Sequence, residues 1–219
     1  MTKSRVSRRA LLRSGLISTA AIGVGSTPAA AARITASQGE GPFYPVTPQA
    51  DRDPDLTRFG DRPGVAEGRV IYVGGQVLAP DGAPIADAVV DIWQANAHGR
   101  YAHEKDQSAA PLDPNFQGWA VLKTDADGRY RFRTVMPGAY AVDASWTRPP
   151  HIHFKVSRRG FVEVTTQMYF PDEPLNAPDR LLNNVTEAEQ AGLIAVPEAF
   201  SGDPDADTLY RFDAVLAPA

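Results

Sequence analysis

The sequence predicts an all-β protein, a β-sandwich with long active-site loops and at most one or two short helices. Short runs of β-forming residues recur about every ten residues, and turn-forming residues separate them. Helix signals are scarce, and only residues 186–193 begin with the capping-box spacing that starts a helix. The 219 residues are enough for one main domain with a buried core.

The expected strands follow the chain from residue 70 onward. The β pattern covers residues 70–78, 88–93, 120–123, 129–133, 152–156, 161–170 and 208–216. The turn at 125–128 predicts one hairpin between its flanking strands, and the turn at 157–160 predicts a second. Two connections, 96–118 and 171–184, are longer than a sandwich needs, and loops of that length are often functional.

The start of the chain has the order of an export signal. The paired Arg8 and Arg9 precede a weakly apolar run and then small residues up to Ala32, which resembles a twin-arginine signal that is removed. We therefore expect three parts: 1–32 as the signal, 33–68 as an extended arm, and 69–219 as the β-sandwich domain that carries the site. A chain with such a signal is expected in the periplasm or outside the cell.

Composition excludes several classes of protein. Residues 1–32 hold five of the 22 basic residues and no acidic one, which leaves 17 basic against 26 acidic residues and a net charge of −9. Such a chain is a poor partner for nucleic acid or anionic membranes, where Lys and Arg supply the affinity. The apolar run is too short and too rich in Gly and Ser for a membrane span, so none is expected in the mature chain. Cysteine is absent, so any metal must be bound by His, Tyr or carboxylate.

His151 and His153 are the first candidates for chemistry. Side chains alternate along a strand, so these two imidazoles point to one face while Ile152 and Phe154 point to the other. Two adjacent neutral imidazoles suit one metal ion, although the spacing alone also fits zinc, copper or a pair of surface histidines. No Asp or Glu stands at the short spacing of a site with two histidines and one carboxylate.

Tyr101 and Tyr140 precede the histidines and offer phenol oxygens. A phenol with a pKa of about 10 gives up its proton only to a strongly Lewis-acidic ion, such as Fe(III). Taken alone, each tyrosine is more readily explained as a half-buried core residue. The tyrosines therefore need support from a wider pattern.

Five segments of the chain supply that pattern. They are Glu40-Gly41-Pro42-Phe43-Tyr44, residues 91–96 with Gly99-Arg100-Tyr101, Pro137-Gly138-Ala139-Tyr140, residues 148–154, and Thr166-Gln167-Met168-Tyr169-Phe170. In this order they resemble the intradiol ring-cleaving dioxygenase family, closest to its protocatechuate 3,4-dioxygenase branch. The resemblance covers nearly the whole chain after the predicted signal.

The resemblance implies an oxidoreductase that cleaves a catechol-type ring with O₂ to a muconate-type diacid. It implies one Fe(III) per chain, with a hydroxide in the fifth position and four protein ligands, Tyr101, Tyr140, His151 and His153. Two phenolates and one hydroxide would balance the charge of the ion, so such a site can be buried. By the same resemblance, Tyr140 would leave the metal and take a proton from the substrate.

Further roles around the metal follow from the resemblance. Arg148 would be catalytic, stabilising negative charge that develops on the substrate. The substrate-binding residues would be Gly41, Pro42, Tyr44 and Gln167. Val142 stands where the protocatechuate branch usually has an aromatic residue, so the identity of the catechol is left open. Assembly into a homo-oligomer is left open as well.

Two other functions fit parts of the pattern. A transthyretin-like or adhesin-type sandwich would share the strands and the export signal but would leave the four ligand-type residues unexplained. A zinc hydrolase would use His151 and His153 and would need a third ligand from a carboxylate or a histidine. If the family resemblance holds, the partners are instead a small catecholic substrate and O₂.

Overall fold

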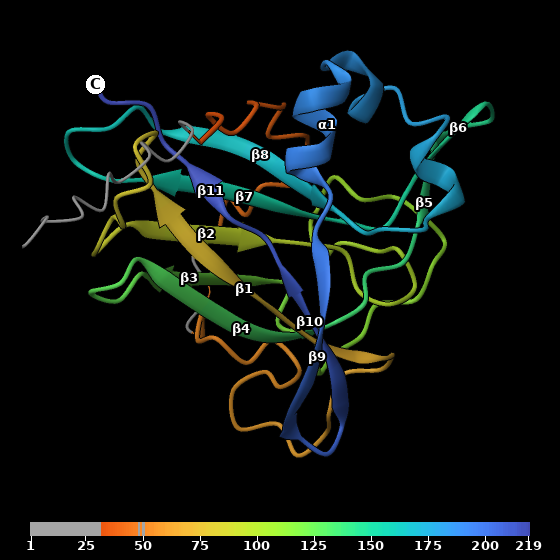
Figure 1. Cartoon of the computed structure of the whole chain (residues 1–219). Helices are drawn as coiled ribbons and strands as arrows, with labels where there is room; N and C mark the ends of the chain where they lie inside the picture. Colours follow the sequence, from red (N-terminus) through yellow and green to blue (C-terminus); the bar gives the residue numbers. More distant parts are fainter. Residues whose placement is uncertain (1–31, 48, 50) are drawn as a thin grey trace, which may run out of the picture.

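The computed structural model describes residues 32–47, 49 and 51–219, and it confirms the predicted all-β sandwich with one short helix (Figure 1). The predicted export signal lies outside the described residues, apart from Ala32 at its end. No helix in the described part of the chain is long and apolar enough to cross a membrane.

The described chain forms eleven strands in two main sheets and a small ribbon. The strands are β1 (Val70–Leu78), β2 (Val89–Trp93), β3 (Trp119–Lys123), β4 (Arg129–Val135), β5 (Tyr140–Asp143), β6 (Trp146–Arg148), β7 (His151–Ser157), β8 (Val164–Tyr169), β9 (Val196–Asp203), β10 (Ala206–Arg211) and β11 (Ala214–Val215). One sheet has the order β11-β1-β10-β9, with β4 also on β1, and the other has the order β3-β2-β7-β8. β5 pairs only with β6, and this ribbon stands to one side of both sheets in Figure 1.

The two sheets pack around a single large apolar core. Phe154 of β7 is completely buried, and its ring centroid lies 6.2 Å from that of Phe132 and 4.9 Å from that of Phe212. On the opposite face of β7, His151 and His153 are each only 2% exposed. β7 is therefore buried on both faces, with the core on one side and the histidines on the other.

The predicted helix is present as α1 (Glu187–Leu193). Its capping box is formed, since the backbone N–H of Thr186 donates to Glu189 Oε2 at 2.8 Å. Leu193 of α1 packs with Leu182 and Tyr169 in a small second cluster, between the 3₁₀ turn Leu182–Asn184 and β8. Another 3₁₀ turn, Pro174–Asn176, lies earlier in the same long connection. The helix thus holds that connection against the end of β8.

One of the two predicted hairpins is wrong. β3 and β4 flank the turn at 125–128, but β3 pairs with β2 and β4 pairs with β1 in the other sheet. The turn is tight, because the backbone N–H of Asp125 donates to Arg129 O at 3.0 Å, yet it carries the chain across the sandwich. The second predicted hairpin is confirmed, since β7 and β8 pair antiparallel around 157–160.

Two further differences concern strands. The stretch predicted as one closing strand is divided into β10 and β11, which pair in parallel with successive parts of β1. β5, β6 and β9 have no counterpart among the predicted strands. β5 and β6 have only four and three residues, so apolar and polar residues cannot alternate over enough positions to predict a strand.

The first part of the arm runs along one edge of the sandwich, from the edge strand β11 to the edge strand β8. The backbone N–H of Thr35 donates to Val215 O of β11 at 3.1 Å, and that of Gln38 donates to Thr165 O of β8 at 2.8 Å. These bonds tie the arm to both sheets. They also bring the segment that follows, Gly41 to Phe43, over the histidine face of β7.

Candidate metal centre and its cavity

Four side chains from three separate parts of the chain converge in one place. Ring centroids are 5.7 Å apart for Tyr101 and Tyr140, 5.6 Å for Tyr140 and His151, 4.9 Å for His151 and His153, and 6.2 Å for Tyr101 and His153. Tyr101 Oη lies 3.4 Å from His151 Nε2. Two phenols and two imidazoles therefore stand close enough together to share one metal ion.

The histidines are neutral, and one of them has a defined tautomer. His151 Nδ1 lies 2.7 Å from Pro149 O, which can only accept, so Nδ1 carries the proton and Nε2 presents its lone pair. Burial lowers the pKa of His151 well below its ordinary value, and the charge of Arg148 acts in the same direction. Burial and then Arg148 lower the pKa of His153 to about 3. Both imidazoles are thus uncharged at neutral pH, as a metal ligand must be.

Two glycines allow the tyrosine-bearing segments to meet. Gly99 has a φ of 78°, in the left-handed region, and a Cβ added there would lie 2.2 Å from Ala139 O. A Cβ added at Gly138 would lie 2.4 Å from the backbone nitrogen of Gly99. A side chain at either position would force the two backbones apart, and with them Tyr101 and Tyr140.

The phenols stay protonated without a cation. Burial raises the pKa of Tyr101 well above its ordinary value, and the neighbouring Tyr140 raises it further. Burial also raises the pKa of Tyr140, although the charge of Arg148 opposes that effect. Tyr101 is only 3% exposed, whereas Tyr140 is half-buried. Only a strongly Lewis-acidic ion would displace both protons at neutral pH.

The donor set fits such an ion and does not fit the zinc alternative. The two neutral imidazoles add no charge, and the two phenolates would offset most of the charge of a trivalent metal. A zinc hydrolase needs a third ligand from a carboxylate or a histidine. Within residues 32–47, 49 and 51–219, no group of three or more His, Asp or Glu side chains is arranged to hold a metal ion.

A cavity of about 540 Å³ opens beside the four side chains. Tyr140 and His153 form part of its wall, and the arm contributes Gly41 and Pro42. A Cβ added at Gly41 would lie 3.4 Å from His153 Cε1, so the arm passes directly over this ring. Most of the remaining wall is apolar. The cavity is thus large enough for a single aromatic ring and lies next to the proposed ligands.

Arg148 enters this cavity from β6, directly across from Tyr140 in the β5–β6 ribbon. Its guanidinium is fully engaged on one side: Nε donates to Asp179 Oδ2 at 2.8 Å, and Nη2 donates to Gln167 Oε1 at 2.6 Å and to Tyr169 Oη at 3.2 Å. Gln167 also lines the cavity, and its Oε1 accepts the hydrogen bond from Arg148 Nη2. The arginine is held rigidly beside the phenol of Tyr140.

Asp179 was not singled out by the sequence, although it is central to this arrangement. It is completely buried, and its Oδ1 accepts the backbone N–H groups of Leu181 at 3.1 Å and Leu182 at 2.8 Å. One carboxylate therefore joins Arg148 to the 171–184 connection. Aspartate is common in loops because it accepts such local bonds, so its surroundings in sequence gave no sign of the distant arginine.

Tyr44 lies apart from the other residues that are expected to bind substrate. Tyr44 is absent from the cavity wall, and its Oη donates to Asp91 Oδ2 of β2 at 2.8 Å. Its ring packs edge-on against Trp93, with centroids 4.8 Å apart. The side chain anchors the arm to the sheet. Its neighbour Phe43 lines the cavity instead and stacks on Tyr101 at a centroid distance of 4.6 Å.

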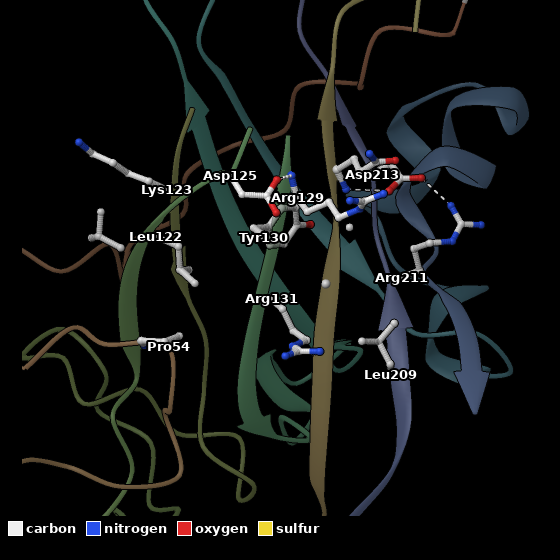
Figure 2. A pocket seen from close by; sticks show the side chains of 14 residues that line it. Pro54, Leu122, Lys123, Asp125, Arg129, Tyr130, Arg131, Leu209, Arg211 and Asp213 are labelled. Atoms are coloured by element: carbon white, nitrogen blue, oxygen red, sulfur yellow. Dashed lines mark hydrogen bonds and ion pairs between the residues drawn. The ribbon is translucent and has the colours of Figure 1, made fainter. Parts of the chain in front are cut away.

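A larger cavity lies elsewhere and carries no such chemistry. It is an open groove of about 800 Å³ over β1, β4 and β10, and Figure 2 shows Arg129, Arg131 and Arg211 along it. Arg211 is paired with Asp213 there. None of the four converging side chains lines this groove. Size alone therefore does not identify the functional site.

Comparisons with known proteins agree with this geometry. A family model described as Dioxygenase matches residues 39–218. The protocatechuate 3,4-dioxygenase beta chain of Burkholderia cepacia is 42% identical over 179 residues, which cover 80% of this chain and 76% of that one. Catechol 1,2-dioxygenase 1 of Acinetobacter lwoffii is 38% identical over 118 residues, covering 48% of this chain but only 37% of that one.

Solved structures agree as well. The dioxygenase domain of a dioxygenase carbohydrate-binding protein fusion from Streptomyces sp. SirexAA-E has a TM-score of 0.62 and 27% identity. That match covers 85% of this chain and 100% of the other.

Replacing Asp179 with Ala should lower the free energy of unfolding by about 3–5 kcal/mol, because it leaves the buried guanidinium of Arg148 without its counter-ion. Replacing Asp127 with Ala is the matched control, since its ion pair with Arg129 is exposed and should contribute less than about 1 kcal/mol. Urea denaturation of both variants measures the difference. If the free energy of unfolding fell by a similarly small amount in both variants, the buried ion pair would not be important for stability.

Proposed function

Because this chain belongs to the intradiol ring-cleaving dioxygenase family, we propose that it cleaves a catechol-type ring between the two hydroxyl-bearing carbons with O₂. The product would be a muconate-type diacid. One Fe(III) per chain would be held by Tyr101, Tyr140, His151 and His153. The observation that carries the proposal is the convergence of two phenols and two neutral imidazoles beside an apolar cavity of ring size.

When bound, Fe(III) would be chelated by the two catechol oxygens and would supply the Lewis acidity and redox chemistry that make the ring reactive toward O₂. The side chains of this protein supply the charge balance that such a buried ion needs. Tyr101 and Tyr140 would contribute one negative charge each, and His151 and His153 would contribute none because their pKa values are lowered. The remaining positive charge suits a small anion such as hydroxide.

Tyr140 is the better placed phenol to receive a proton from the substrate. Its side chain lines the cavity and is half-buried, whereas Tyr101 is 3% exposed and lies behind Phe43. A catechol that enters the cavity would meet Tyr140 Oη first. The phenolate of Tyr140 would accept one substrate proton there, and Tyr101 would stay in place.

Arg148 would stabilise negative charge on the substrate. It lies across from Tyr140 in the ribbon, and Asp179 and Gln167 prevent the guanidinium from turning away. A donor that is already oriented costs no reorganisation when charge develops on a nearby oxygen. The apolar wall beside it, including Phe43 and Trp146, would limit the access of water.

Two features of the wider protein belong to the proposal. The relative from Burkholderia cepacia is named a beta chain, which favours assembly of this chain into an oligomer. The order of residues in 1–32 favours export through a twin-arginine pathway. Removal of that segment would leave the arm attached, since the backbone N–H of Thr35 donates to Val215 O.

Replacing Tyr101 or Tyr140 with Phe should reduce bound iron and weaken the visible colour, because phenolate-to-Fe(III) charge transfer needs the phenol oxygen. Tyr72 to Phe is the control, because the Tyr72 hydroxyl donates to Asp203 on the far sheet and should not affect iron. Elemental analysis and visible absorption of the purified proteins measure both quantities. Full iron content and unchanged absorption in the two site variants would contradict the proposed ligands.

Iron-loaded protein supplied with catechol should consume about one O₂ per ring opened and give a diacid that contains both oxygen atoms. Oxygen uptake with ¹⁸O₂ and mass spectrometry of the product test this outcome. A semialdehyde product, which forms when the ring opens beside the diol, would contradict the cleavage position.

Replacing Arg8 and Arg9 together with Lys should retain the protein in the cytoplasm of a host that has twin-arginine transport. Replacing Arg13 with Lys is the control, because Arg13 lies outside the pair, and this variant should be exported as usual. Cell fractionation and N-terminal sequencing measure export and the site of removal. Equal distribution of the two variants would contradict the twin-arginine signal.

A further inference from the structure

The wall of the 540 Å³ cavity carries charge at only two positions, Asp106 and Arg148. Arg148 forms a buried ion pair with Asp179, with side chains 4% and 0% exposed, and its charge acts on Tyr140 and the two histidines at the metal end of the cavity. Asp106 is 7% exposed and has no cationic partner among the described residues. Its Oδ2 accepts the backbone N–H of Tyr101 at 2.7 Å, and its Oδ1 accepts that of Ser108 at 2.9 Å. Taken with Asp179, the cavity therefore has a net negative charge.

The part of the cavity beyond Tyr140 is apolar. Val142 follows Tyr140 by two residues, at the register irregularity between Ala141 and Asp143 in β5. Val142 lines the cavity together with Trp146 and Leu181. A ring whose two hydroxyls reach the metal would direct its other substituents toward this region.

Arg180 lies close to Trp146 but does not line this region of the cavity. The guanidinium carbon of Arg180 lies 5.0 Å from the centroid of the Trp146 ring, but Arg180 is absent from the cavity wall. It is exposed, and its side chain pairs with Asp143 at 3.8 Å and donates to Ser145 Oγ at 3.0 Å. Among the described residues that line the cavity, a negatively charged substituent would thus find no cation besides Arg148, which is paired with Asp179.

We infer that this site selects catechols whose ring substituent is uncharged and apolar and that it discriminates against ring carboxylates. The inference rests on the proposed function and names its substrate class. A carboxylate here would lose part of its water, gain no counter-ion from the described wall and share the cavity with the negative charge of Asp106. A methyl group in the same position would instead contact the apolar side chains of Val142 and Trp146 and would gain up to roughly fourfold in affinity.

Two catechols of similar size separate these cases on the iron-loaded protein. 4-Methylcatechol should bind roughly 100-fold more tightly than 3,4-dihydroxybenzoate, and the ratio of their kcat/KM values should have the same direction. Dissociation constants come from anaerobic titration of the visible spectrum, and kcat/KM comes from oxygen uptake. Equal or tighter binding of the carboxylate would overturn the inference.

A charge placed on the cavity wall tests the cause. Val142 is 49% exposed, so a lysine can replace it without disturbing the core. Val142→Lys should reduce the ratio of the dissociation constants of 3,4-dihydroxybenzoate and 4-methylcatechol by roughly tenfold. Val162→Lys adds the same charge at a position that is 53% exposed and outside the cavity, so the ratio and the activity should stay unchanged. If both variants change the ratio equally, the location of charge in the cavity is not the cause and the inference fails.

The two readouts separate this inference from the proposed function. Preferential binding of 4-methylcatechol without any ring cleavage would support the cavity selectivity and contradict the enzymatic proposal. Ring cleavage with 3,4-dihydroxybenzoate as the preferred substrate would support the enzymatic proposal and overturn the selectivity.

Discussion

The site depends on one strand that is buried on both faces. In β7, alternation sends Ile152 and Phe154 into the core between the sheets and sends His151 and His153 to the opposite side. A shift of one residue in the pairing of β7 with β2 and β8 would exchange the two sets and place imidazoles in the core. Packing of the core therefore fixes where the imidazoles stand. The two histidines among the proposed metal ligands are therefore held in place by a strand whose other face is packed in the core.

After burial itself, the charge of one buried cation has the largest effect on the pKa values of these imidazoles. Arg148 helps to lower the pKa of both histidines and opposes the effect of burial on Tyr140. A buried guanidinium is tolerated only because Asp179 compensates it and Gln167 accepts a further bond. No other Lys or Arg lines the cavity wall among the described residues. One ion pair thus prepares the metal site and also limits which substituents the cavity can accept.

The histidine pair could be predicted from a local pattern, whereas the other site residues could be predicted only through the family resemblance of five segments. The His-x-His spacing has a direct geometric meaning on a strand, and the capping box of α1 was equally local. The roles of Asp179 and Asp106 could not be predicted in this way. Asp179 bonds to Arg148, 31 positions away, and nothing beside it in sequence identifies that partner. Tyr44 shows the converse, since a residue inside a recognisable segment turned out to bind Asp91 of β2.

The sequence by itself determined the all-β class, most of the strands, the alternation of β7 and its hairpin with β8, because these follow from local periodicity and turn residues. The two tyrosines were identified as ligand-type residues through the family resemblance. Apart from the β7–β8 hairpin, only the tertiary structure decided which strands pair. The tight turn at 125–128 has the features of a hairpin, yet β3 pairs with β2 and β4 pairs with β1 in the other sheet. Each strand pairs with a partner that is distant in sequence. Tertiary structure also decided that Gly99 meets Ala139 and so brings the two tyrosines together. Contacts between distant segments depend on the packing of the entire chain, and no local pattern encodes them.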